Sequence, residues 1–236
     1  MRVALFVTCV NDAVYPSTGI ATVRLLERLG VEVDFPAAQT CCGQPQYNTG
    51  YRPEARRLAR RTAGAFEGHT YVVTPSASCA AMVRDHYARL GEPDLAPRTY
   101  ELTEFLVDVL GVTDVGAYFP HRVTYHPSCH GLRLLGLGDR PRRLLEAVRG
   151  LELVELPGAE ECCGFGGTFA VKNPAVSVAM GRDKVRHAVG TGADVLCGGD
   201  NSCLMHIDGV LRREGERMRA LHIAEILAAT EEEQPR

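Results

Sequence analysis

The cysteine pattern of this chain occurs twice. In each half a single cysteine is followed 32 or 33 residues later by an adjacent Cys-Cys-Gly sequence, and a last cysteine follows after a further 37 or 40 residues. Corresponding cysteines are offset by 120 to 124 residues. The two sets are Cys9, Cys41, Cys42, Gly43 and Cys79 in the first half, and Cys129, Cys162, Cys163, Gly164 and Cys203 in the second.

The residues around the cysteines repeat as well. Arg2-Val3 before the first cysteine matches Arg122-Val123, and Pro36 and Pro157 each lie five residues before a Cys-Cys-Gly sequence. Self-similarity at a fixed offset indicates a duplicated structural unit. We therefore predict two repeat domains, residues 1–118 and 119–236, with the boundary near residues 116–120.

Short apolar runs alternate with helical patterns in both halves, which predicts an α/β fold with parallel sheets and crossover helices. The two repeats are expected to be pseudo-symmetric, each a small, mainly parallel sheet flanked by helices. We expect strands at 2–8, 31–35, 70–74, 122–125, 151–156 and 193–197, and helices at 17–29, 53–66, 80–90, 102–110, 141–148, 174–189, 204–213 and 223–229.

Each repeated cysteine follows a predicted strand, so we expect it in a loop at the carboxyl end of that strand. Ligands of parallel α/β sheets bind at this edge. The four cysteines of one half should therefore meet at one site.

Composition limits the function classes that need to be considered. Hydrophobic residues make up 45% of the chain and the net charge is −3, which is typical of a globular protein and disfavours a nucleic-acid partner. The N-terminal apolar run, Val3 to Val7, is too short for a signal peptide or a transmembrane helix, so we expect a cytoplasmic protein. In a reducing cytosol cysteines are rarely disulfides, and an odd number, nine, cannot all be paired.

Four thiolates per half suit either zinc or an iron–sulfur cluster. Zinc ligands are usually two to four residues apart, whereas a cluster offers neighbouring thiolates different iron atoms, so the adjacent pair favours a cluster. Gly43 and Gly164 would let the backbone turn sharply and bring N–H groups towards the sulfur atoms. Zinc in one or both repeats stays open, as does a thiol–disulfide enzyme that uses the adjacent cysteines.

These motifs, with Thr74-Pro75-Ser76-Ala77-Ser78-Cys79 and the segment 200–207, resemble the cysteine-rich CCG domain family over nearly the whole chain. That family includes the B subunit of heterodisulfide reductase, the iron–sulfur subunit of glycolate oxidase and the lactate utilization protein A group, and the chain is most similar to the last. The resemblance implies an oxidoreductase subunit with one or two clusters, [4Fe–4S] in type, that transfers electrons in a complex oxidising L-lactate or another small 2-hydroxy acid. It also implies a ferredoxin-type iron–sulfur subunit and a third small subunit as partners. A zinc-stabilised scaffold without redox activity is the alternative.

The chain departs from the family's fullest motif, which ends in Cys-x-x-Cys. Ser76 and Asp200 occupy the first of these positions, so each half has four cysteines rather than five, and an oxygen ligand could replace the missing thiolate.

The remaining candidates have ordinary interpretations. Cys197 aligns with Val73 on a predicted strand and is expected to be a buried strand residue. Near the repeated cysteines lie three histidines that could bind a metal or donate to a sulfur, although a loop histidine is more often structural: His126, His130 and His206. The glycine-rich segment 164–167 lacks the spacing of a nucleotide-binding loop.

Overall fold

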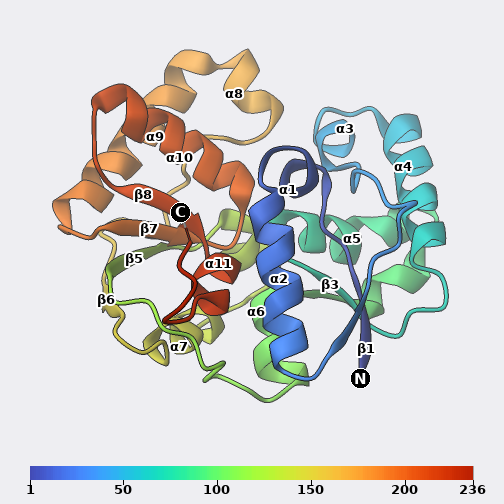
Figure 1. Ribbon diagram of the computed structural model, residues 1–236. Coiled ribbons are helices and arrows are strands. Elements are labelled where there is room, and N and C mark those ends of the chain that lie inside the picture. Colours follow the sequence, from blue (N-terminus) through green and yellow to red (C-terminus); the bar gives the residue numbers. More distant parts are fainter. Residues whose placement is uncertain (236) are drawn as a thin grey trace.

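The computed structural model, which describes residues 1–235, contains two four-stranded parallel sheets, one in each half of the chain (Figure 1). Their strand orders are β2-β1-β3-β4 and β6-β5-β7-β8, so the second sheet repeats the topology of the first. The predicted α/β fold with two similar repeats is confirmed. The strands are β1 Arg2–Leu5, β2 Glu32–Asp34, β3 Val72–Thr74, β4 Thr99–Glu101, β5 Arg122–His126, β6 Glu152–Val154, β7 Val195–Gly198 and β8 Arg219–His222.

Strands β4 and β8 were not predicted from the sequence. Each lies at the end of its sheet, where it pairs only with β3 or β7. Their sequences, Thr-Tyr-Glu and Arg-Ala-Leu-His, are short and partly polar, and so lack the apolar run by which the central strands were recognised. Pairing with a neighbouring strand, which is a tertiary contact, makes these segments strands.

Helices cover both faces of each sheet (Figure 1). The predicted helices are present, but three cysteines that were expected in loops lie in helices. Cys9 starts α1, a helix that was not predicted, and Cys79 and Cys203 lie in the first turns of α5 and α10, which begin earlier than predicted. The helices are α1 Cys9–Val14, α2 Pro16–Arg28, α3 Gln44–Asn48, α4 Arg52–Ala65, α5 Ala77–Leu90, α6 Leu102–Glu104, α7 Arg140–Glu146, α8 Thr168–Lys172, α9 Pro174–Gly190, α10 Asn201–Glu214 and α11 Ile223–Ala228, with a 3-10 helix at Pro93–Arg98 and π-helical turns at Phe105–Val109 and His130–Leu134.

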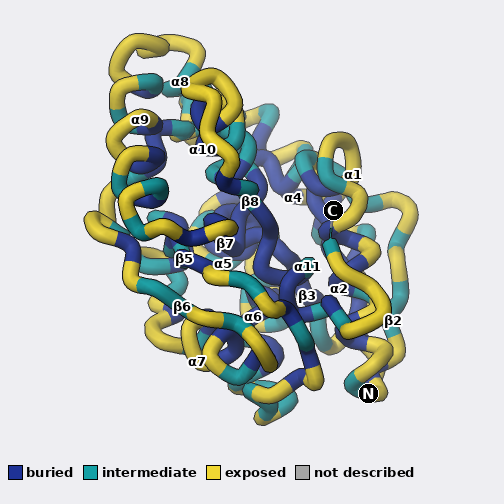
Figure 2. The backbone as a smooth tube through the Cα atoms, turned by 60° about the vertical axis from the view of Figure 1, so that its left-hand side comes forward, coloured by how far each residue is buried: buried dark blue, intermediate teal, exposed yellow. Residues whose placement is uncertain are grey.

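The outer face of each sheet has its own apolar core. Phe6 and Val72 of the first sheet pack against α4 and α5, and Leu196 of the second packs against α9 and α10. Figure 2 shows that β3 and β7 run through buried parts of the molecule, whereas exposed residues follow the outer turns of α9. The alternation of side chains along a strand explains why neighbours such as Val72 and Val73 belong to different cores.

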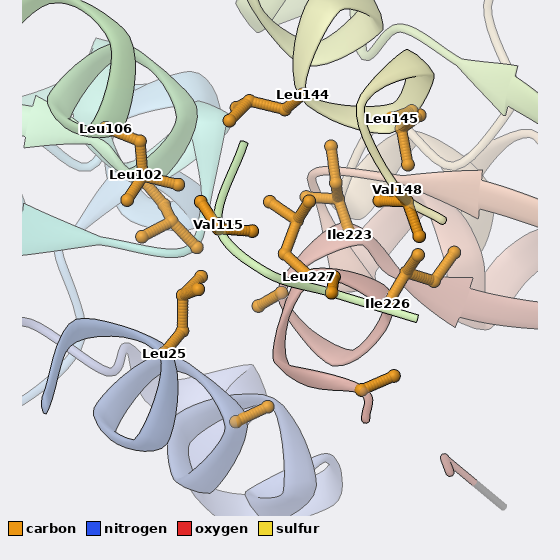
Figure 3. Close-up of a cluster of buried hydrophobic side chains, with 14 of the residues drawn as sticks. Leu25, Leu102, Leu106, Val115, Leu144, Leu145, Val148, Ile223, Ile226 and Leu227 are labelled. Atoms are coloured by element: carbon orange, nitrogen blue, oxygen red, sulfur yellow. The ribbon is translucent and has the colours of Figure 1, made fainter. Parts of the chain in front are cut away.

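The inner faces of both sheets share a single core. Leu25 of α2 and Leu102 of α6 meet Leu144 of α7 and Ile226 of α11 around Val115 of the connecting segment (Figure 3). Helix α11 of the second half packs directly on α2 of the first. This common core fixes how the two halves face one another, while the domain boundary at residue 118 stays a prediction about folding units.

Among residues 1–235, the structure has no helix that combines the length and the apolar character needed to cross a bilayer.

Candidate functional site

All eight repeated cysteines line one cavity of about 460 Å³ between the two halves. Sequence reasoning predicted a separate site at the edge of each sheet. The structure brings the cysteines of each half together and also turns the two groups towards the same cavity. Polar residues from both halves complete the lining, among them Asn11, Gln44, His130 and Asp200.

In each half, three segments that are distant in sequence supply the thiols. In the first half Cys9 begins α1, the adjacent pair precedes α3, and Cys79 lies in the first turn of α5. The Sγ atoms of Cys42 and Cys79 are 3.3 Å apart. The second half uses the corresponding segments after β5, after β6 and at the start of α10, so the duplication of sequence is also a duplication of geometry.

The glycine of each Cys-Cys-Gly sequence makes the turn that its position predicts. Gly43 has φ +82° and Gly164 has φ +93°, values that side-chain-bearing residues rarely adopt. Each glycine N–H points back at the first cysteine of its pair: the N–Sγ distance is 3.4 Å from Gly43 to Cys41 and 3.3 Å from Gly164 to Cys162. The glycine thus aims a backbone dipole at a sulfur atom.

One cysteine of each set is stabilised as a thiolate. Hydrogen bonds from Cys42, Cys9 and the Gly43 N–H lower the pKa of Cys41, and equivalent bonds from Cys129 and Cys163 lower that of Cys162. The thiols of Cys42 and Cys163 donate hydrogen bonds to Cys41 and Cys162. These bonds, together with burial, raise the pKa values of Cys42 and Cys163. The first cysteine of each pair is therefore the one at which negative charge is best stabilised.

His126 lies beside the second set of cysteines. It ends strand β5, is 1% exposed, and places a ring nitrogen within 4.8 Å of the Sγ atoms of Cys163 and Cys203, which are equally close to one another. Neither ring nitrogen has a hydrogen-bond partner among residues 1–235. Burial lowers the pKa of His126 to about 4, which leaves the imidazole neutral near pH 7 with a free lone pair.

The other two candidate histidines already have protein neighbours. Nε2 of His130 lies 3.2 Å from Nε2 of Gln44 in the first half, and Nε2 of His206 lies 3.1 Å from the carbonyl oxygen of Ser177. His130 lines the cavity, whereas His206 lines a different pocket. Nothing in the sequence favoured one of the three histidines as a ligand. In the structure, His126 differs from the other two because it is buried and has no hydrogen-bond partner within residues 1–235.

Ser76 and Asp200, which stand where the family's motif has cysteine, act as helix N-caps. The Ser76 hydroxyl accepts the Cys79 N–H, and Asp200 Oδ1 accepts the Ser202 N–H at 3.2 Å. The second oxygen of Asp200 accepts the Ser78 N–H of the first half at 2.8 Å. Asp200 therefore joins the starts of α5 and α10 across the interface of the halves, a role that the sequence did not indicate.

Cys197 confirms its predicted structural role. It is fully buried on β7, in the core shared by both halves, as is the corresponding Val73 on β3. Burial raises the pKa of its thiol well above the usual value, which disfavours the thiolate form needed for metal binding.

The donor set fits an iron–sulfur centre in each half. Each offers four sulfur donors from three segments, a stabilised thiolate and a glycine N–H directed at sulfur, which are features that tune such clusters. A zinc ion would need four donors around one point. Among residues 1–235, the group of three donors that lie within 4.8 Å of one another is that of His126, Cys163 and Cys203.

Fold and site together define a duplicated, cysteine-rich α/β protein with a thiol-lined cavity between its halves. A family model described as the cysteine-rich domain, CCG, matches residues 3–84 and 123–208, so both repeats are recognised. A solved structure of a hypothetical protein from Helicobacter pylori aligns with a TM-score of 0.68 at 9% identity, over 96% of this chain. This chain spans about half (48%) of that chain, and the likeness concerns the fold alone.

Relatives that match over nearly the whole of both chains have a much higher sequence identity than this solved structure. Lactate utilization protein A of Oceanobacillus iheyensis is 53% identical over 235 residues, covering 96% of each chain. Lactate utilization protein A of Geobacillus kaustophilus is 54% identical over 237 residues, covering 97% of this chain and 99% of the relative. The chain belongs to the lactate utilization protein A family of cysteine-rich CCG domain proteins.

Proposed function

We propose that this chain is the iron–sulfur, electron-transfer subunit of a cytoplasmic complex that oxidises a 2-hydroxy acid, L-lactate, to pyruvate. The observation that carries the proposal is the convergence of eight cysteines from two repeats on one cavity. Full-length relatives named lactate utilization protein A support the choice of substrate class.

Residues of this chain would hold two centres, one per repeat. The first would use Cys9, Cys41, Cys42 and Cys79, and the second Cys129, Cys162, Cys163 and Cys203. An iron–sulfur cluster, [4Fe–4S] in the proposal, accepts and releases single electrons when it is bound. The glycine N–H groups at Cys41 and Cys162 stabilise negative charge on sulfur, and the apolar cores behind the cavity limit the access of water.

Partner subunits complete the proposed reaction. The oxidation of lactate releases two electrons, which must pass to an acceptor. Cys9 is exposed, so the rim of the cavity is open to solvent on this side. We propose that a ferredoxin-type iron–sulfur subunit and a third small subunit dock near this rim and pass electrons to or from the two centres. This chain is then an oxidoreductase subunit rather than a complete enzyme.

Anaerobic purification followed by reconstitution with iron and sulfide tests the proposal. We expect stoichiometric iron and sulfide, little zinc, and visible absorption that bleaches on reduction. With the partner subunits present, L-lactate should also bleach the absorption. A colourless protein with stoichiometric zinc and no iron would refute the proposal in favour of a zinc-stabilised scaffold, and bleaching by glycolate instead of lactate would correct the substrate.

Cysteine variants test which residues bind. Cys42→Ser and Cys163→Ser should each remove the absorption of one centre, about half of the total if the two are alike. Cys197→Ala is the matched control, because this cysteine is buried in the shared core and does not line the cavity. Iron content that is unchanged in both serine variants would contradict ligation by the adjacent cysteines.

A further inference from the structure

We propose that His126 is a ligand of the second centre, together with Cys163 and Cys203, so that the two halves hold chemically different centres. The proposal rests on the proposed function in that it assumes a metal centre in the second half. It adds a nitrogen ligand to a set that the sequence motif describes as purely cysteine.

The first argument is distance. A metal ion binds cysteine sulfur at about 2.3 Å and histidine nitrogen at about 2.0–2.1 Å, so two ligands of one tetrahedral ion lie about 3.5–3.8 Å apart. The donor atoms of His126, Cys163 and Cys203 all lie within 4.8 Å of one another. Side-chain movements of about 1 Å or less would bring all three donor atoms within reach of one metal centre.

The second argument is the lack of another partner. His126 is buried, and neither ring nitrogen is within hydrogen-bonding distance of a partner among residues 1–235. A buried polar atom without a partner costs about 1–3 kcal/mol, so a protein rarely retains one without a ligand or water. A bound metal would be the partner of one ring nitrogen and would offset part of the free-energy cost of burying the imidazole.

The third argument is the contrast with the first half. At an offset of 120 residues, Phe6 occupies the position that His126 has in the second half. Phe6 is completely buried and packs against Phe66, with ring centroids 5.2 Å apart. An apolar ring therefore satisfies the packing at this position, and packing alone gives no reason for a histidine in the second half.

Other side chains near the second set are already engaged. Asp200 caps α10 and holds the Ser78 N–H, while His206 faces the Ser177 carbonyl. Lys184, which is 1% exposed, donates from Nζ to the carbonyl oxygens of Gly158 and Ala159. In contrast to these three side chains, His126 has no hydrogen-bond partner within residues 1–235 for either ring nitrogen.

An imidazole ligand changes what the centre can do. Neutral imidazole donates a lone pair to the metal without adding negative charge, whereas a thiolate adds one. Iron–sulfur centres with histidine among their ligands have higher reduction potentials than all-thiolate centres. A nitrogen-ligated second centre and an all-sulfur first centre would therefore differ in potential, which gives electron flow through the cavity a direction.

Pulsed electron paramagnetic resonance on reconstituted, paramagnetic protein labelled with [15N]histidine tests the inference. The Cys42→Ser variant retains only the second centre, and we expect coupling to a directly bound histidine nitrogen. The added substitution His126→Phe, which restores the first-half residue, should abolish this coupling, whereas His130→Gln should leave it intact. The Cys163→Ser variant retains only the first centre and should show no such coupling.

A cysteine variant distinguishes the loss of a ligand from a failure to fold. His126→Cys keeps a metal ligand, so the second centre should remain, its histidine coupling should vanish and its potential should fall. An iron-loaded Cys42→Ser protein without histidine coupling would overturn the inference and leave the proposed function standing. Failure of the unmodified protein to bind a cluster at all would overturn both.

Discussion

The two halves of the molecule share a scaffold but differ in the residues directly behind their cysteines. Both have a four-stranded parallel sheet, a Cys-Cys-Gly turn with a left-handed glycine and a capped helix that carries the last cysteine. Behind the first set lie apolar side chains such as Phe6, whereas His126 and Lys184 are buried near the second set. The two halves therefore share the arrangement of their cysteines and differ in the side chains that pack behind them.

The largest expected difference concerns the two turn glycines. A Cβ on Gly164 would lie 2.4 Å from the Ser177 carbonyl oxygen, whereas the nearest atom to one on Gly43 is 3.3 Å away. Because steric overlap adds to the strain of a left-handed backbone, Gly164→Ala should lower the free energy of unfolding by about 3–5 kcal/mol, and Gly43→Ala by about 1–2 kcal/mol. Urea unfolding of the metal-free, reduced variants measures both. Equal losses would mean that the second turn is no more tightly packed than the first.

The two N-caps should differ next. Asp200→Ala removes a cap and leaves the buried Ser78 N–H without its acceptor, so we expect a loss of about 2–4 kcal/mol in unfolding free energy. Ser76→Ala removes a cap and should cost about 1 kcal/mol. The same urea titrations distinguish the two. A loss for Asp200→Ala no greater than that for Ser76→Ala would argue against its role across the interface.

A smaller contrast depends on pH, because Glu101 and His222 occupy corresponding caps after β4 and β8. Burial raises the pKa of Glu101 from 4.5 to about 7, so the folded protein holds a proton that the unfolded chain has lost, and stability falls as pH rises between these values. The slope is about 1.4 kcal/mol per pH unit at most. Burial lowers the pKa of His222 below 6.5, so its contribution is lost as pH falls below that value.

Unfolding free energies measured from pH 4 to 8 test this contrast. Glu101→Gln keeps an oxygen that can accept the Thr103 N–H and should flatten the profile between pH 4.5 and 7. His222→Asn, also a good cap, should reduce the loss of stability below pH 6.5. Unchanged profiles would show that neither group titrates differently in the folded and unfolded states.

Much of the fold was predictable because the central strands carry uninterrupted apolar runs. Strands β1, β3, β5 and β7 and most helices were placed from the sequence to within a few residues. The edge strands β4 and β8 were missed, since three or four partly polar residues become a strand only through pairing with a neighbour. Helices α5 and α10 begin earlier than predicted because Ser76 and Asp200 cap them, which places the last cysteine of each set inside the first helical turn.

The sequence by itself determined the duplication, the α/β class and the eight thiols, because spacing and hydrophobic periodicity are local properties of the chain. Tertiary structure alone decided that both sets of thiols line one cavity, since this depends on the core in which α2 and α11 pack together. It also separated His126 from the other histidines, because burial and the lack of a partner among residues 1–235 arise from contacts between segments far apart in sequence. Spacing identifies which groups can bind a metal, and packing determines which of them meet.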